Sequence, residues 1–310
     1  MQFISRFQDS IYRFFDGDIW YSFTQSRTTM AAAFVTVILV VAAVFAPLFS
    51  LQNPFDPAAL DLMDAFGPPV WAEEGQWRFP LGTDDQGRDL YSTILYGSRL
   101  SLLIGFASVL FALVLGVTLG LISGYLGGAV DAVIMRIADV QMSFPSILIA
   151  LLIDGVARAV MPGEKHEELV VYVLILAIGL SQWVNFARTV RGSTMVERNK
   201  EYVQAARVIG VSRLFIMVRH IMPNVMGPVL VIATIGLAVA ILSEATLSFL
   251  GVGVPPTQPS LGTLIRIGQD FLFSGEWWIV IFPGATLAAL ILAVNLLGDW
   301  LRDALNPKLR

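Results

Sequence analysis

The chain contains no cysteine and only two histidines in 310 residues. A disulfide framework and thiolate metal sites are therefore excluded, and two distant histidines do not predict a zinc centre. Charged residues are scarce as well, at 14% of the chain, where soluble domains carry about 25%. Apolar residues reach 56%, and the mean hydropathy is +0.71. This composition predicts a membrane protein rather than a soluble domain.

Motifs of catalysis are also missing. The chain has no G-x-x-x-x-G-K-[ST] phosphate loop, no H-E-x-x-H pair and no G-x-S-x-G elbow. An acidic cluster at Asp84, Asp85 and Asp89 lacks the alternate ligands, glycine and distal glutamate of a calcium loop. We therefore expect no catalytic residue, metal or cofactor in this chain, and no nucleic-acid partner.

Long apolar stretches are the main structural signal. About 20 apolar residues cross a bilayer as a helix, and these stretches are too long and too uniform for barrel strands. The stretches are 28–50, 98–124, 135–154, 169–187, 225–249 and 277–298. They predict an all-α polytopic membrane protein with six transmembrane helices. The third stretch carries Arg136, Asp139 and Pro145, so its span is expected to begin nearer Val140.

Loop charges predict the orientation. Lys and Arg outnumber acidic residues in segment 188–224, which makes this segment cytoplasmic under the positive-inside rule. Loop 51–97 is acidic and is expected outside, together with 251–276. Both termini, including the tail 301–310, are then cytoplasmic.

The remaining organisation follows from these spans. Segment 1–27 places Phe3, Phe7 and Ile11 at helical spacing, which favours an amphipathic helix on the membrane surface, with disorder as the alternative. The apolar run at 28–50 is longer than the roughly 7–15 residues of a signal peptide, so it is interpreted as the first transmembrane helix. Residues 98–300 form the transmembrane core.

Segment 199–224, NKEYVQAARVIGVSRLFIMVRHIMPN, interrupts the apolar chain with two predicted short helices that meet at Gly210. Gly210 is expected to end the first helix, and Ser212 can cap the second by accepting from backbone N–H groups. Pro223 predicts that the second helix ends near Met222. Small residues at Ala205 and Ala206 would let a partner approach closely.

At these residues the chain resembles a known family. EYVQAARVIG at 201–210, followed by RHIMPN at 219–224, is similar to the EAA loop of permease subunits in ABC importers. PLGTDDQGRD at 80–89, LSFLGVG at 247–253 and GDWLRD at 298–303 resemble the second, C-type permease of dipeptide and oligopeptide systems. The resemblance covers nearly all of the chain from about residue 80 onward.

The resemblance implies an ABC importer permease fold in a bacterial inner membrane, with a cytoplasmic helix–Gly–helix coupling loop. It implies a related permease subunit as heterodimer partner, two ATPase subunits that hold ATP and Mg, an extracytoplasmic binding protein and membrane lipid. Short peptides are the implied substrates, although nickel chelates, modified peptides and sugar-linked compounds fit the same branch. An ion-coupled secondary transporter is the alternative, and a structural anchor subunit is a third class.

The resemblance also assigns candidate residues. Those expected to couple to the ATPase are Glu201, Ala205, Ala206, Gly210, Leu214, Phe215, Pro223 and Asn224. Glu201 could instead only stabilise its own helix through the dipole.

Three further groups of residues come from the remaining sequence. Ionisable or polar groups at membrane depth often line a pathway or a gate, which makes Glu244, Asn185 and Asn295 candidates. Interfacial exposure is the alternative for Glu244 and for Asp154, and helix association is the alternative for Asn185 and Asn295. Outside the membrane we predict a helix-capping motif with Thr83 as N-cap. Its residues are Thr83, Asp84, Gln86, Arg88 and Asp89. Glycines at 116, 120 and 124 predict a close helix contact.

Overall fold

The computed structural model describes residues 18–56, 60–161 and 163–304, and within these ranges the chain is mostly helical and has no β-strand. Five helices are long and apolar enough to cross a membrane. They are α3 (Arg27–Val44), α5 (Leu90–Leu126), α8 (Glu164–Glu197), α11 (Met222–Phe249) and α13 (Trp278–Ala304). The predicted amphipathic helix around Phe3 and Phe7 lies outside the described residues.

The third apolar stretch differs from the prediction of a single span. It is divided into α6 (Gly128–Met142) and α7 (Ser146–Val160), which meet at an angle of 93°. Pro145 is the physical reason, because proline removes a backbone donor and forces Phe144 out of helical geometry. If this bent pair counts as one span, the protein has six candidate spans.

Helices α5 and α8 form the centre of the molecule, and they approach each other along the predicted glycine face. A Cβ atom on Gly116 would lie 2.6 Å from the carbonyl oxygen of Trp183, and one on Gly120 would lie 2.6 Å from that of Ala187. Only glycine permits this separation. The predicted packing role of these glycines is therefore confirmed.

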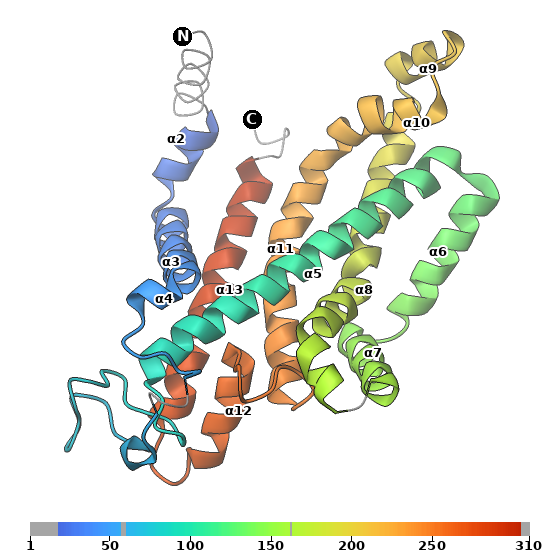
Figure 1. Cartoon of the computed structure of the whole chain (residues 1–310). Helices are drawn as coiled ribbons and strands as arrows, with labels where there is room; N and C mark the ends of the chain where they lie inside the picture. The colour runs from blue at the N-terminus through green and yellow to red at the C-terminus, as the bar shows by residue number, and fades with distance from the viewer. Residues whose placement is uncertain (1–17, 57–59, 162, 305–310) are drawn as a thin grey trace, which may run out of the picture.

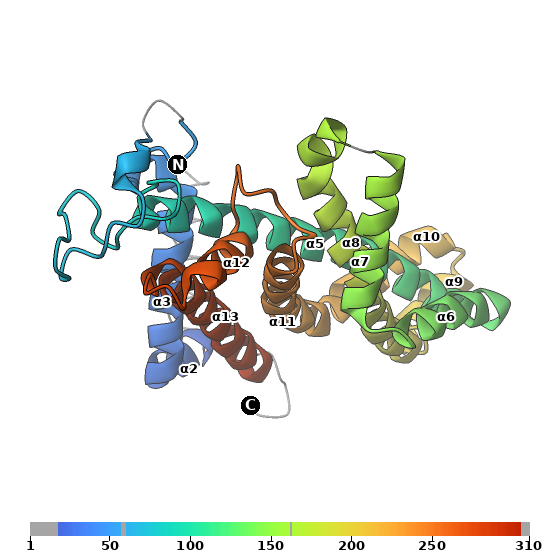
Figure 2. The same cartoon turned by 90° about the horizontal axis from the view of Figure 1, so that it is seen from below.

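The two ends of the helical bundle carry different segments (Figure 1). At one end lie α2 (Asp18–Gln25), the last turns of α13, and the short helices α9 (Glu201–Val208) and α10 (Arg213–Phe215). At the opposite end lie α12 (Leu261–Phe271) and the long connection between α4 (Ala46–Phe49) and α5, which includes the short 3-10 helix η2 (Leu62–Asp64). Viewed from below, α11 lies between α8 and α13 (Figure 2).

Several boundaries differ from those predicted. The first span ends at Val44 and is followed by the separate α4, because Pro47 interrupts the helix. Helix α8 continues past residue 187 to Glu197, so the first part of segment 188–224 is helix and not loop. Helix α12 lies inside the predicted loop 251–276 and was missed; Ser260 caps it by accepting from the backbone N of Thr263.

Replacing Gly120 with alanine should lower the free energy of unfolding by about 1–3 kcal/mol, because the new methyl group would overlap α8. Gly192→Ala on α8 is the matched control, since its Cβ would meet nothing within 4 Å and alanine favours the helix by roughly 1 kcal/mol. Thermal unfolding of the purified, detergent-solubilised protein measures both changes. Equal melting temperatures for the two variants would contradict the close contact.

Candidate functional site

The segment that follows α8 forms the predicted helix–Gly–helix. Helix α9 ends in a Schellman motif, in which Gly210 N donates to Arg207 O at 3.1 Å and Val211 N donates to Ala206 O at 3.0 Å. Gly210 has φ +83°, in the left-handed region that glycine tolerates. A Cβ atom at this position would meet nothing within 4 Å. The turn therefore requires glycine for its backbone angle and not for space.

The second helix differs from the prediction, because it does not end near Met222. Ser212 caps α10 as expected, accepting from Phe215 N at 3.4 Å. A π-helical turn, η3 (Ile216–Ile221), then leads directly into α11. Pro223 lies at the start of α11 directly after this π-turn, whose widened backbone accommodates a residue without an N–H.

Asn224 compensates for the irregular backbone beside this proline. Its side-chain Nδ2 donates to His220 O at 2.8 Å, and to the hydroxyl of Tyr202 at 2.9 Å. The same hydroxyl donates to Glu197 at the end of α8, whose carboxylate also pairs with Lys200 at 2.8 Å. Burial raises the pKa of Tyr202, and the hydrogen bond to Glu197 raises it further. Sequence reasoning missed Tyr202, which fastens α9 to the start of α11.

An internal apolar contact holds the two halves of the segment together. Val203, Ala206, Ile216 and Ile221 are all buried within the chain. Because Val203 and Ala206 are three residues apart on α9, they face the same side of the helix. Ala206 is only 4% exposed, so it is not available on the surface as predicted. Of the alanine pair, only Ala205 is exposed.

The outer side of the same segment is apolar and exposed. Val208 is 87% exposed, Ile209 78%, Leu214 67% and Phe215 52%. Such a cluster of large apolar side chains on a short polar segment marks an interaction surface. We call these four residues the apolar tip. Glu201 is exposed in the first turn of α9, where its charge also suits the helix dipole.

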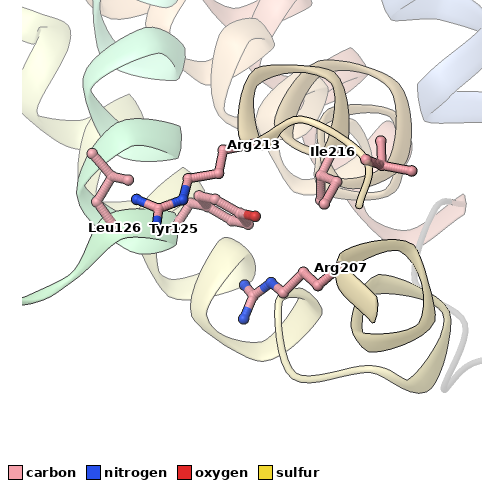
Figure 3. Close-up of a pocket in the computed structure, with 6 residues that line it drawn as sticks. Tyr125, Leu126, Arg207, Arg213 and Ile216 are labelled. Carbon is pink, nitrogen blue, oxygen red and sulfur yellow. The ribbon is translucent and has the colours of Figure 1, made fainter. Parts of the chain in front are cut away.

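A pocket of about 410 Å³ lies between this segment and the end of α5 (Figure 3). The guanidinium group of Arg207 lies 4.9 Å from the ring centre of Tyr125, a cation–π contact. On the same end of α5, Arg198 donates to the carbonyl oxygen of Gly124 at 2.7 Å. Arg213 lines the pocket as well. These contacts connect α9 mechanically to α5.

A salt bridge joins α6 to α8 on this side. The two nitrogens Nε and Nη2 of Arg191 donate to the carboxylate of Asp131 at 2.5 and 2.6 Å. Ser123 of α5 donates to the same carboxylate. A bidentate arginine pair with a third donor is among the stronger polar contacts in proteins. The end of α5, the first turn of α6 and the end of α8 are thus bound together.

The acidic residues at membrane depth are not exposed at an interface, which corrects the alternative offered for them. Glu244 is fully buried and accepts hydrogen bonds from Ser101 and Ser248, both at 2.7 Å. Asp154 is also fully buried and pairs with Arg158 at 2.6 Å. The two serine hydroxyls and the arginine supply the polar partners that such buried acidic groups need.

The two candidate asparagines lie apart. Asn185 is exposed on α8 and lines a pocket between α8 and α11. Asn295 is half-buried on α13. Neither contacts Glu244 by a hydrogen bond within residues 18–56, 60–161 and 163–304.

The motif at 83–89 does not form the predicted capping box, because the helix begins later. Gly87 has φ +73°, so no helix can run through it. Asp89 is the N-cap of α5 and accepts from Ser92 N at 2.8 Å. Thr83 instead donates to Asp64 O and accepts from Gly67 N at 2.7 Å.

The rest of this motif forms a buried polar cluster outside the spans. Arg88 is 1% exposed; its Nε pairs with Asp84 at 2.6 Å and its Nη1 donates to Pro256 O at 3.1 Å. Asp84 also accepts from the backbone N of Gln86. The indole of Trp278 donates to Thr83 O. The motif therefore joins the first outer loop to the second and to α13.

In the part of the chain that the structure describes, no group of three or more His, Cys, Asp or Glu residues could hold a metal ion. The described residues form a bundle of helices, several of them long and apolar enough to cross a membrane, with a helix–Gly–helix segment at one end. This arrangement is that of a membrane-embedded protein.

Comparison with known proteins gives the family. Residues 116–310 match the family described as binding-protein-dependent transport system inner membrane component, and residues 13–69 match the N-terminal transmembrane domain of oligopeptide transport permease C. The chain belongs to the binding-protein-dependent transport system inner membrane components.

Several curated relatives span almost the whole chain. The di/tripeptide transport system permease protein DppC of Pseudomonas aeruginosa is 38% identical over 94% of this chain and 92% of its own. The dipeptide permease DppC of Haemophilus influenzae is 36% identical over 94% and 95%. The oligopeptide permease OppC of Bacillus subtilis is 36% identical over 94% and 90%.

A solved structure shares the fold. An inward-facing form of the MetNI methionine ABC transporter matches with a TM-score of 0.54 at 18% identity, covering 69% of this chain and 96% of the matched chain. The fold is thus that of an ABC importer permease.

The burial of Asp89 should change how the stability of the protein depends on pH. Burial raises the pKa of this carboxyl above its ordinary value of 3.8, although Ser92 donates to it. The folded state therefore binds the proton more tightly than the unfolded state does. The stability that this proton contributes is fully present below pH 3.8 and is lost as the pH rises through the raised pKa.

Asp89→Asn mimics the protonated acid and keeps the cap, so its stability relative to the wild type should increase as the pH rises from about 4 to 7. Asp89→Ala should lose about 1 kcal/mol with the cap. Melting temperatures of the purified protein across this pH range measure both effects. A constant difference between wild type and Asp89→Asn would contradict the raised pKa; Asp85→Asn controls for its neighbour, whose pKa is also raised by burial.

Proposed function

We propose that this chain is one of two related permease subunits of an ATP-driven ABC importer that carries di- and oligopeptides across a bacterial inner membrane. The exposed apolar tip on a rigid helix–Gly–helix carries the proposal, because such a surface needs a partner. The relatives named for dipeptide, di/tripeptide and oligopeptide transport support peptides as the substrate class.

Partner subunits supply what the chain lacks. ATP and Mg bind to two ATPase subunits on the cytoplasmic side, and an extracytoplasmic binding protein delivers the peptide. The chain itself catalyses no reaction and binds no nucleic acid. Its own task is to form half of the translocation pathway and to convert motion of the ATPases into motion of the membrane helices.

The orientation proposed for this task places both termini and the apolar tip in the cytoplasm. The excess of Lys and Arg in segment 188–224 supports it. So does the position of α9, α10, α2 and the end of α13 at one end of the bundle, with the acidic loop and α12 at the other (Figure 1).

The apolar tip, which includes Leu214 and Phe215 from the predicted set, is the proposed contact with an ATPase, together with Glu201 and Ala205. Ala206 supports this contact from inside, because it packs against the second helix and holds the tip in place. The internal hydrogen bonds of Tyr202 and Asn224 keep the segment rigid, so a displaced α9 takes the ends of α5 and α8 with it.

A single cysteine at Val208 tests contact and orientation together, since the chain has no native cysteine. In intact cells an impermeant maleimide should not label Val208→Cys but should label Met63→Cys, which is 90% exposed in the outer loop. In inverted vesicles, Val208→Cys should crosslink to an ATPase subunit. Labelling of Val208→Cys in intact cells would refute the orientation, and the absence of any crosslink would refute the docking surface.

Gly210→Val should abolish most ATP-dependent uptake, because valine at φ +83° costs on the order of 1–3 kcal/mol of strain and redirects the second helix. Gly210→Asn is the matched control: asparagine tolerates this backbone angle, and the site is open to its side chain. Peptide uptake and ATPase co-purification are measured at equal membrane levels. Normal uptake by the valine variant would show that the elbow is not needed.

Uptake must also depend on the ATPase subunits. Vesicles that contain the two permeases without the ATPases should show no uptake driven by an ion gradient. Gradient-driven uptake there would favour a secondary transporter instead.

A further inference from the structure

A second pocket lies within the membrane-spanning part, between α8 and α11, with a volume of about 380 Å³. On α11 its wall is apolar and is formed by Ile232, Ile235 and Val239, with Gly236 among them. On α8 its wall combines the ring of Phe186 with polar side chains that include Gln182 and Asn185. The pocket therefore offers one apolar side and one side with hydrogen-bonding groups.

Gln182 is the unusual member of this wall. Its side chain is only 5% exposed, and its Nε2 atom has no hydrogen-bond acceptor among the residues the structure describes. A buried amide without a partner costs on the order of 1–3 kcal/mol. Gln182 faces Gly236 across the pocket, since a Cβ atom at 236 would lie 3.6 Å from Gln182 Oε1. The amide oxygen thus lies on the side of Gly236, and a half-turn of the amide exchanges Oε1 and Nε2 and brings the donor to the pocket side.

The polar residues of α8 follow one another at helical spacing. Gln182, Asn185 and Thr189 are three and four residues apart and so share one face of the helix. Within a bilayer, such a face belongs against protein or a water-filled cavity and not against lipid tails. The stripe therefore indicates that this side of α8 faces protein or a water-filled cavity and not lipid.

The pocket carries no uncompensated charge. Arg188, which also lines it, donates to the carboxylate of Asp139 on α6. A free carboxylate or ammonium group would find no unpaired opposite charge on this wall. The chemistry suits an uncharged polar acceptor next to an apolar group, which is the chemistry of a peptide main chain and its side chain.

We propose that this pocket is a peptide-binding place on the translocation pathway. The amide of Gln182 donates to a main-chain carbonyl of the peptide in transit, and the apolar wall of α11 receives a side chain. Gly236 keeps the wall open for that side chain. The proposal rests on the proposed function, and it assigns main-chain binding to Gln182 and side-chain selectivity to the wall around Gly236.

The test uses the complete complex in proteoliposomes, with the binding protein and ATP, and two labelled peptides, Ala-Ala and Leu-Leu. Gln182→Leu should lower uptake of both peptides about tenfold. This factor corresponds to about 1.4 kcal/mol, which is the size expected for the loss of one hydrogen bond. Gly236→Leu should fill the apolar wall and lower the ratio of Leu-Leu to Ala-Ala uptake about fivefold or more. Ser243→Ala is the control on α11, because Ser243 is half-buried and its hydroxyl donates to Val239 O of its own helix.

The readouts separate a pathway role from a structural one. Subunit co-purification and melting temperature report assembly, and the peptide ratio reports selectivity, which a general loss of folding would not change. If Gln182→Leu fails to assemble, the ratio of Leu-Leu to Ala-Ala uptake by Gly236→Leu decides whether the pocket binds peptide. Uptake within twofold of wild type for Gln182→Leu, or an unchanged ratio for Gly236→Leu, would overturn the pocket. A wild-type complex that takes up neither peptide would overturn the proposed function itself.

Discussion

The contact between α5 and α8 is the constraint on which the rest of the structure depends. Glycines at 116, 120 and 124 bring the two backbones together, and their small size allows dispersion contacts along about two turns. In a bilayer, helices gain little from the hydrophobic effect when they associate, so close packing must supply the stability. The end of α8 is then fixed where α9 begins, and α11 packs against the same pair.

Polar groups strengthen this frame at both ends of the bundle. On one side, Asp131 and Arg191 join α6 to α8, and Arg198 caps the carbonyls of α5. On the other, Arg88 ties the first outer loop to the second through Asp84 and a backbone carbonyl. A rigid frame of this kind can transmit displacement, because packed helices move as bodies and do not deform continuously. Among the described residues, Arg88 keeps one nitrogen, Nη2, without a hydrogen-bond partner, as does the amide nitrogen of Gln182 on the α8–α11 wall.

Segment 199–224 combines a rigid interior with an apolar exterior. Its elbow depends on the backbone angle of Gly210, and its interior on Ala206 and the hydroxyl of Tyr202. The exposed tip adds no stability to the isolated chain, since leaving large apolar side chains in water forgoes about 1.5–3 kcal/mol each. A surface retained at that cost is explained by a partner that covers it.

Local sequence determined much of this protein. Apolar length alone located the long helices, glycine spacing located the α5–α8 contact, and the elbow at Gly210 followed from local helix chemistry, because each of these depends on neighbouring residues. Tertiary structure decided the rest. It placed the N-cap at Asp89 and not at Thr83, and it buried Ala206 against the second helix. It also joined the second helix to α11 through a π-turn and buried Gln182 beside a pocket. These outcomes depend on which distant elements meet, and a one-dimensional pattern does not record such contacts.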